Sequence, residues 1–320
     1  MIKTKLYILF LVFPIFIFSQ KIENTASFRD IKTARYFRFN YDNDYFTGTD
    51  QNYTQGYSFE YVAPILKKNP LNYLLIKPQQ NNELKFGLAI EHIGFTADNI
   101  KSEEIQFGDR PFAASIMLKS FVISTDTIQK SRLVSSLNLG LIGPGAFGKE
   151  MQVAIHKATG NTIPGGWQNQ IKNDAVINYE INYEKQLLRF SNFFSISANS
   201  NAKIGTLFTN ASIGLNTTVG LINNPFSSVK TKNKFEFYVF AQAFVSAIGY
   251  DATLQGGLFN KNSPYTINST AIERFTAQTN YGFIIQSRSM YLEYYQTLQT
   301  REYETGKSYK WGGIKIGFKF

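Results

Sequence analysis

The feature that most constrains this chain is a two-residue alternation of apolar and polar side chains, repeated in segments along most of its length. In the final segment, WGGIKIGFKF, one face is apolar and the other carries lysine: Ile314, Ile316, Phe318 and Phe320 alternate with Lys315, Gly317 and Lys319. A period of two predicts β-strands, because successive side chains of a strand point to opposite faces. Strands that are apolar on one side and charged on the other are typical of a barrel with a lipid-facing outside and a polar inside.

The composition also favours a β-barrel that crosses a membrane with its strands. Aromatic residues make up 16% of the chain, yet its mean hydropathy is only -0.19. A membrane barrel explains this combination, because aromatic side chains gather at both membrane interfaces while the lumen stays polar. The alternatives are a secreted β-sandwich or β-helix. The chain has no cysteine, so no disulfide can stabilise any of these folds.

Residues 1–19 are expected to form a signal peptide. The stretch MIKTK is positively charged, and the apolar run that follows at 6–18 is shorter than the about 20 residues that a membrane-spanning helix requires. Cleavage is expected after Ser19 or Gln20, and the lack of cysteine excludes a lipoprotein anchor. No repeat or linker divides the remainder, so residues 20–320 are predicted to form one domain.

Twelve segments have the length and alternation expected of barrel strands. Single-chain bacterial barrels have an even number of strands, and a tilted strand crosses the membrane in about 9–11 residues. The fold expected is therefore an all-β, twelve-stranded antiparallel transmembrane barrel. The predicted strands are 33–43, 54–63, 83–93, 111–124, 132–142, 175–187, 193–205, 210–222, 234–248, 273–286, 289–299 and 309–320.

The strand count also sorts the connections between the two ends of the barrel. If both termini lie in the periplasm, the connections that follow odd-numbered strands face outward. Three long, polar connections are of this kind: 44–53, 94–110 and 143–174. We expect them to meet at one rim, at the outer leaflet of the membrane.

A short helix is predicted inside the third of these outward-facing connections, at 148–159. A glycine opens it, no proline interrupts it and another glycine follows it. Gln152 and His156 are four residues apart, so they project from the same helical face. Histidine is the side chain best suited to accept a proton near neutral pH, so His156 is a candidate general base. The other histidine, His92, is expected to be structural.

The first connection lies within NDYFTGTDQNYTQG, at 43–56, and is rich in oxygen ligands. Adjacent residues of a strand point to opposite faces, so Asn43 and Asp44 can serve one site only if the strand ends or bulges there. The Asp44 carboxylate, the Asn43 amide and the Thr54 hydroxyl are hard donors of the kind that calcium prefers. The EF-hand spacing is absent, and a polar hairpin turn without a metal is the alternative.

Together these segments resemble the outer-membrane lipid A 3′-O-deacylase family of the LpxR type, over nearly the whole mature chain. The matching motifs are NDYFTGTDQNYTQG at 43–56, GDRPFAA at 108–114, GPGAFGKEMQVAIH at 143–156, GWQNQI at 166–171 and YLEYYQTLQTREY at 291–303. The resemblance implies a twelve-stranded barrel in the outer membrane of a Gram-negative cell. It also implies a calcium-dependent esterase that removes the 3′-linked acyl chains from the lipid A of lipopolysaccharide at the outer leaflet.

The resemblance implies roles for individual residues. His156 is the base that activates water, and Gln152 lies one turn before it. Asn43, Asp44 and Thr54 line the same catalytic site. Asp44 is the expected metal ligand, and Ca²⁺ is expected to stabilise the oxyanion.

Two further positions concern the substrate. Lys101 matches a lysine that the family places near the lipid, and Arg110 is a candidate for bidentate hydrogen bonds to a lipid A phosphate. The alternative for Arg110 is a pair with Asp109 that fixes the loop. Some relatives carry an acid after the histidine, where this chain has Asn161 and Thr162, so no metal or orienting role is assigned to that position.

The formal net charge of +10 suits an anionic glycolipid, and for a secreted barrel we expect no nucleic acid partner and a monomer. Two other functions fit the sequence. One is an outer-membrane phospholipase, which would need a nucleophile such as Ser115 or Ser136. The other is a non-catalytic structural or porin-like barrel, although inward side chains such as Lys315, Lys319 and Glu236 are expected to plug the lumen, so a wide pore is not expected.

Overall fold

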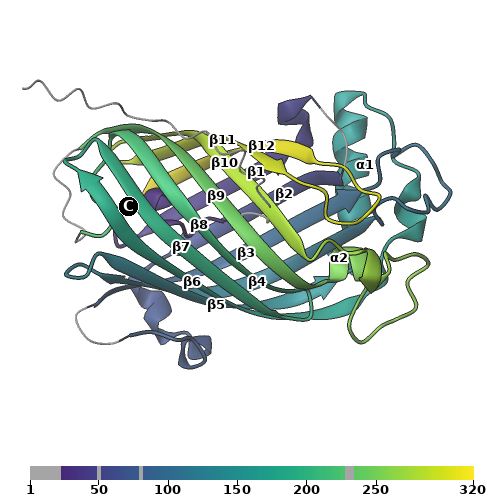
Figure 1. Ribbon diagram of the computed structural model, residues 1–320, viewed down its shortest axis with the longest axis horizontal. Helices are drawn as coiled ribbons and strands as arrows, with labels where there is room; N and C mark the ends of the chain where they lie inside the picture. Colours follow the sequence, from purple (N-terminus) through teal and green to yellow (C-terminus); the bar gives the residue numbers. More distant parts are fainter. Residues whose placement is uncertain (1–22, 49–51, 79–81, 228–233) are drawn as a thin grey trace, which may run out of the picture.

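The computed structural model describes residues 23–48, 52–78, 82–227 and 234–320, and the expected signal peptide lies outside these ranges. Twelve antiparallel strands close into one barrel, in which each strand pairs with its neighbours in sequence and β1 pairs with β12 (Figure 1). The predicted all-β barrel is confirmed. The strands are β1 (Tyr36–Asn43), β2 (Asn52–Val62), β3 (Asn82–Thr96), β4 (Ala113–Asp126), β5 (Ser131–Ile142), β6 (Asp174–Phe190), β7 (Phe194–Gly205), β8 (Phe208–Leu221), β9 (Glu236–Asp251), β10 (Phe275–Gln286), β11 (Met290–Gln299) and β12 (Tyr309–Lys319).

The helices precede β1 or lie in the connections between strands. The α-helices are α1 (Gly148–Thr159), which is the helix predicted at 148–159, and α2 (Ala252–Gln255). The 3-10 helices are η1 (Ser27–Arg29), η2 (Asp44–Thr47), η3 (Pro64–Lys68), η4 (Pro70–Tyr73), η5 (Pro144–Ala146), η6 (Gly166–Asn169) and η7 (Ser269–Ala271). In the described part of the chain, none of the helices has the length and apolar character needed to cross a membrane.

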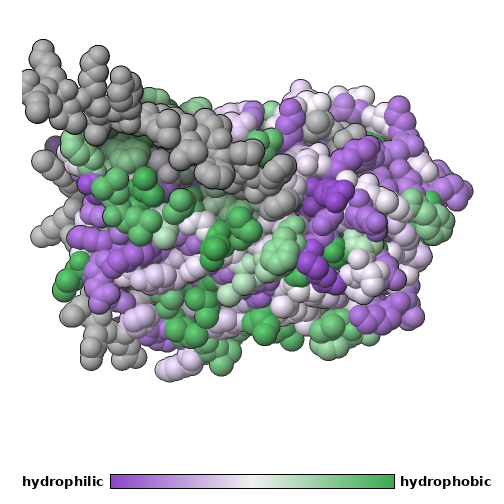
Figure 2. Space-filling model, viewed as in Figure 1, coloured by the Kyte–Doolittle hydropathy of each residue, from purple (hydrophilic) through white to green (hydrophobic). Residues whose placement is uncertain are grey.

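Alternation along the strands separates a polar interior from an apolar outer wall. In β1, Arg38, Asn40 and Asp42 are buried inside the barrel, whereas Phe37 and Phe39 are half-buried on its outside. Figure 2 shows apolar patches along the wall, while the end of the barrel that carries α1 is mainly hydrophilic. An apolar wall of this kind is the surface that a membrane barrel presents to lipid.

The connections that follow odd-numbered strands gather at one end of the barrel, called the α1 rim here because it carries α1 (Figure 1). The second and third of the long polar connections pack against each other at this rim. Gly165 N donates to Ile100 O at 2.8 Å, and Asn169 Nδ2 donates to Glu103 O at 2.8 Å. The predicted meeting of these connections at one rim therefore holds.

The barrel lumen is partly filled by the segment that precedes β1, residues 23–35, which we call the plug. Most of its residues are buried. Arg29 forms an ion pair with Glu293 of β11 at 2.8 Å, and Ser27 N donates to Glu184 of β6 at 2.6 Å. The plug is thus held by charged side chains from widely separated strands, and no periodicity in the sequence predicts it.

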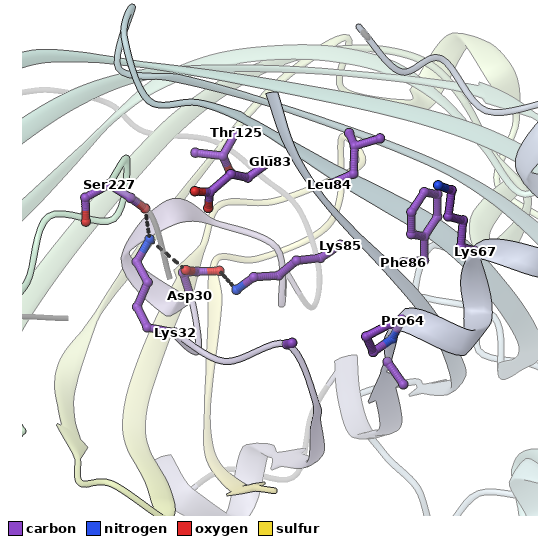
Figure 3. A pocket seen from close by; sticks show the side chains of 12 residues that line it. Asp30, Lys32, Pro64, Lys67, Glu83, Leu84, Lys85, Phe86, Thr125 and Ser227 are labelled. Carbon is purple, nitrogen blue, oxygen red and sulfur yellow. Dashed lines mark hydrogen bonds and ion pairs between the residues drawn. The ribbon is translucent and has the colours of Figure 1, made fainter. Parts of the chain in front are cut away.

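A cluster of ion pairs holds the plug at the end of the barrel opposite the α1 rim. Asp30 lies 3.1 Å from each of three basic groups, on Lys32, Lys85 and Arg132. Figure 3 shows Asp30 between the two lysines, at the edge of a cavity of about 240 Å³. The plug carboxylate is therefore paired with a lysine of the plug itself and with basic side chains of β3 and β5.

The inward side chains that were expected to fill the lumen lie there together with the plug. Lys315 is buried and donates to Asn24 Oδ1 at 2.6 Å. Glu236 is buried and accepts from Asn223 N at 2.7 Å, and Lys319 is half-buried at the end of β12.

Candidate functional site

A pocket of about 720 Å³ lies at the α1 rim, between α1 and the outer face of the barrel wall. Tyr41 and Asn43 of β1 line it from the outward face of the strand, since they alternate with the lumen residue Asp42. His156 of α1 and Lys101 of the second connection line it from the other side. The pocket is thus built on the outside of the barrel, next to the apolar wall.

Asn43 and Asp44 line the same pocket because β1 ends between them. The Asn43 side chain fixes this turn: its Oδ1 accepts from Tyr45 N at 2.7 Å, and its Nδ2 donates to Thr54 O at 2.5 Å. Gly48 closes the turn with a φ of 70°, a left-handed conformation that favours glycine. The predicted end of the strand at this point is confirmed.

One face of α1 is buried against the protein. Its buried residues are Gly148, Gln152 and His156, which are spaced four apart and therefore share one stripe. A Cβ at Gly148 would lie 2.4 Å from the Ala114 Cβ and 2.7 Å from the Trp167 ring, so only glycine permits this close approach. The start of α1 is thereby seated against β4, and the next two turns lie over the site.

Gln152 joins α1 to the start of β2. Its Nε2 donates to Thr54 Oγ1 at 2.8 Å, and its Oε1 accepts from the Trp167 indole Nε1 at 2.7 Å. Because an indole nitrogen only donates, this second bond fixes which end of the amide faces Thr54. Gln152 and Trp167 are each 1% exposed, and a polar group that loses its partner in such a place is destabilising. Gln152 therefore positions α1 rather than lining the pocket.

His156 is held in one tautomer by the main chain. Its Nδ1 lies 2.5 Å from the carbonyl oxygen of Thr162. A carbonyl only accepts, so Nδ1 carries the proton and Nε2 of the neutral ring keeps its lone pair. The carbonyl thus fixes both the tautomer and the orientation of the ring, which is also what a third group does for the histidine of a catalytic triad.

The orienting carbonyl of Thr162 was not predicted, because a main-chain group has no signature in the sequence. Gly160 ends α1 with a φ of 71°, which turns the chain back toward the helix. Asn161 and Thr162 then line the pocket beside His156. No acid occupies this position, and the carbonyl oxygen supplies the orienting contact instead.

Lys101 reaches the pocket from the second connection, as expected for a residue near the substrate. It is exposed, and the bend that presents it is fixed by its backbone N, which donates to Asn99 Oδ1 at 3.2 Å. Asn99 and Asp98 line the same part of the pocket. The ammonium group therefore lies on the solvent side of the site.

Arg110 does not line the pocket, so its position in the structure does not support the expected contact with a lipid A phosphate. Its guanidinium is buried, ion-pairs with Glu302 and donates to Thr253 Oγ1 at 2.7 Å. It also lies 4.0 Å from the centroid of the Phe95 ring. Burial disfavours its charged form, but Glu302 together with Tyr309, Asp251 and Tyr303 outweighs burial and raises the pKa of Arg110. An arginine engaged in this way fixes the rim.

Asp109 and Arg110 fix the rim separately and not as a side-chain pair. The Asp109 carboxylate accepts from the Arg110 backbone N at 2.6 Å, from Asp98 N at 2.8 Å and from Tyr303 OH at 3.0 Å. Each residue thus links the second connection to the one between β11 and β12. The side-chain pair of Asp109 with Arg110 that was expected as the alternative is therefore wrong for the described structure, in which each residue fixes the rim through other partners.

The pocket offers oxygen donors to a cation. The Asp44 carboxylate, the Asn43 amide oxygen and the Thr54 hydroxyl all belong to residues that line it. Across the described residues, no group of three or more His, Cys, Asp and Glu side chains is placed to hold a metal. A site with one carboxylate completed by amide, hydroxyl, main-chain and water oxygens suits calcium and does not suit zinc, which prefers nitrogen and sulfur.

A closed antiparallel barrel with an apolar wall and a polar pocket at one rim defines an integral outer-membrane β-barrel protein. The sequence matches the family described as "Outer membrane protein LpxR" over residues 6–320. The chain belongs to this LpxR family.

Two solved structures resemble the chain, and the likeness to the first supports the same fold. LpxR from Salmonella typhimurium is 19% identical and matches 89% of this chain and 100% of its own, with a TM-score of 0.73. The beta domain of the Bordetella autotransporter BrkA is 5% identical and matches 89% of this chain and 98% of its own, with a TM-score of 0.45. The comparison with curated proteins gave no significant match.

Proposed function

We propose that this protein hydrolyses the 3′-linked acyl esters of lipid A, using a water activated by His156. Membership of the LpxR family supports an outer-membrane lipid A deacylase. The observation that carries the mechanism is the pocket itself, which joins a tautomer-fixed histidine to an oxygen-rich turn on the outside of the barrel. A lipid can enter such a pocket from the membrane with its acyl chains still against the apolar wall.

The chemistry assigned to His156 is proton transfer in both directions. Nε2 takes a proton from water as the water oxygen bonds to the ester carbonyl carbon. The bond between that carbon and the sugar oxygen then breaks, and the imidazolium returns the proton to the departing oxygen. The products are a free fatty acid and a 3′-hydroxyl group. The contact of Nδ1–H with Thr162 O keeps the ring in place throughout.

Stabilisation of the developing oxyanion is assigned to the first connection. Asp44, with the side-chain oxygens of Asn43 and Thr54, would hold calcium, which when bound supplies positive charge for that oxygen. Asn43 also keeps Asp44 in the pocket through its bonds to Tyr45 N and Thr54 O.

Lys101 is assigned to the substrate headgroup. An exposed ammonium at the solvent side of the pocket suits a phosphate of the lipid, because Lys binds phosphate as a compact positive charge. Since lipopolysaccharide occupies the outer leaflet, the α1 rim would face outward. We expect the barrel to act as a monomer.

The two other functions are less well supported. A phospholipase of the serine type needs a nucleophile beside the histidine, and no serine is found among the described residues that line the pocket. Ser115 is buried and donates to Leu141 O at 3.0 Å, and Ser136 is buried in β5. A porin needs an open lumen, and here the plug and the inward charged side chains occupy it.

The test is mass spectrometry of lipid A from cells that express the chain or its His156→Asn variant, with calcium present. We expect loss of 3′-linked acyl mass only with the unaltered chain. Heat-modifiable migration on gels, which reports a folded barrel, serves as the control for both. Unchanged lipid A alongside altered phospholipids would instead favour the phospholipase. Equal activity of the folded His156→Asn variant would overturn the assigned base.

A further inference from the structure

The connection between β2 and β3 folds back over the outside of the barrel at the end opposite the α1 rim. We call its described part, residues 63–78 with η3 and η4, the wall segment. Figure 1 shows it in slate blue, outside the strands and away from α1. Leu75 is 4% exposed and belongs to a cluster with Phe86 and Val122, which lie on the outward faces of β3 and β4. The wall segment thus covers a patch of the surface that other strands expose to lipid.

The covered patch also contains outward polar groups, and the wall segment forms hydrogen bonds with them. Ser120 of β4 accepts from Asn69 Nδ2 at 2.9 Å, and Ser135 of β5 donates to Ile76 O at 2.7 Å. Tyr179 OH of β6 donates to Leu74 O at 3.0 Å. Outward hydroxyl groups would be poorly placed against hydrocarbon, so these bonds indicate that the wall segment stays on the barrel as part of the fold.

The other side of the wall segment is apolar and basic. Four large apolar side chains point away from the barrel: Ile65 is 59% exposed, Tyr73 90%, Leu74 62% and Ile76 52%. This surface is continuous with the lipid-facing wall, because the covered strands β3 and β4 expose Ile90 and Leu118 farther along the same face.

Lysines lie among these apolar side chains. Lys67 and Lys68 are both exposed, at the end of η3. Figure 3 shows Lys67 apart from the ion pairs between Asp30 and its lysines. Apolar and aromatic side chains beside exposed lysines are the pattern of a segment that lies in a membrane interface and faces anionic headgroups.

We propose that the wall segment is an interfacial anchor seated in the phospholipid leaflet at the rim opposite the site. Ile65, Tyr73 and Leu74 enter the acyl boundary, while Lys67 and Lys68 bind the phosphates of anionic phospholipids. The anchor fixes how deep the barrel sits, and hence the height of the α1 rim above the other leaflet. It requires a barrel in a membrane and does not depend on the proposed deacylase chemistry.

The test is depth-dependent fluorescence quenching of a Tyr73→Trp variant refolded into vesicles of phosphatidylcholine with or without phosphatidylglycerol. The matched control is Phe107→Trp, at a residue 81% exposed on the α1 rim. The signal of the two buried native tryptophans is subtracted by using the unaltered chain. We expect acyl-brominated lipid to quench the Tyr73→Trp variant several-fold more than the Phe107→Trp variant, and aqueous iodide to do the reverse. Equal iodide quenching of both variants, without an effect of brominated lipid, would overturn the anchor.

The headgroup part of the proposal is tested in the same vesicles. Adding Lys68→Glu to the Tyr73→Trp chain should reduce quenching by brominated lipid when phosphatidylglycerol is present, and leave it unchanged in phosphatidylcholine alone. Arg288→Glu, an equal change of charge at an exposed site in the turn between β10 and β11, is the control and should have no effect. Equal responses of Lys68→Glu and Arg288→Glu would refute specific headgroup binding.

Discussion

Replacing Gln152 with leucine tests whether the proposed base depends on the two buried hydrogen bonds of Gln152, which hold α1 against the barrel. Leucine keeps the size and helix propensity of the residue but removes both hydrogen bonds, to Thr54 Oγ1 at 2.8 Å and from Trp167 Nε1 at 2.7 Å. Each buried group left without a partner costs about 1–3 kcal/mol. Even about 2 kcal/mol would lower the ratio of docked to undocked α1 roughly 30-fold, because each 1.4 kcal/mol is about tenfold. The barrel strands should be unaffected.

The expected result is a fall in kcat with an unchanged melting temperature of the barrel. A second readout follows from the exposed lysines of α1, Lys149 and Lys157. If α1 undocks, trypsin should cleave after these residues faster in Gln152→Leu than in the unaltered chain. Met151→Leu, at a half-buried neighbour, is the matched control and should change neither rate. Unchanged cleavage together with unchanged turnover would refute the idea that the hydrogen bonds of Gln152 hold α1 in place.

The remaining predictions concern the metal, the plug and the rim. Removing calcium with a chelator should abolish deacylation, and adding it back should restore activity; full turnover in chelator, with no metal found by elemental analysis, would exclude a role for the metal. Arg29→Ala should lower the free energy of unfolding by about 3–5 kcal/mol, because the Glu293 carboxylate is left buried without its ion pair. The same variant should raise the conductance of the barrel in planar bilayers. An unchanged unfolding curve would contradict the role of the plug. Arg110→Ala should destabilise the rim by unpairing Glu302 but leave KM for lipid A unchanged, whereas a raised KM with unchanged stability would return Arg110 to the substrate.

The strands and the helix were predictable because their signals are local. Alternation over about ten residues reports which faces meet lipid and lumen, and a glycine at each end defines α1. The position of Asn43 and Asp44 at the end of β1 was also predictable, since two adjacent residues can line one pocket only where the strand ends.

The parts that were missed depend on contacts between distant residues or on the main chain. Arg110 was read beside its neighbour Asp109, but its partner Glu302 is 192 positions away. The carbonyl of Thr162 orients His156 whatever its side chain is. The plug has no periodicity, because its residues are held one by one by individual charges on different strands, of which Glu184 is one example.

The plug also has a consequence for biogenesis. It is joined directly to β1, and β1 pairs with β12 to form the closing seam. The plug is bound through Arg29 to Glu293 of β11 and through Ser27 to Glu184 of β6, so its partners come from strands made much later than itself. The plug is synthesised before any strand, so it stays without these partners until nearly all the strands have been made. The ion pair between Arg29 and Glu293 can therefore form only in a chain that already contains β11, the neighbour of the strand that closes the seam.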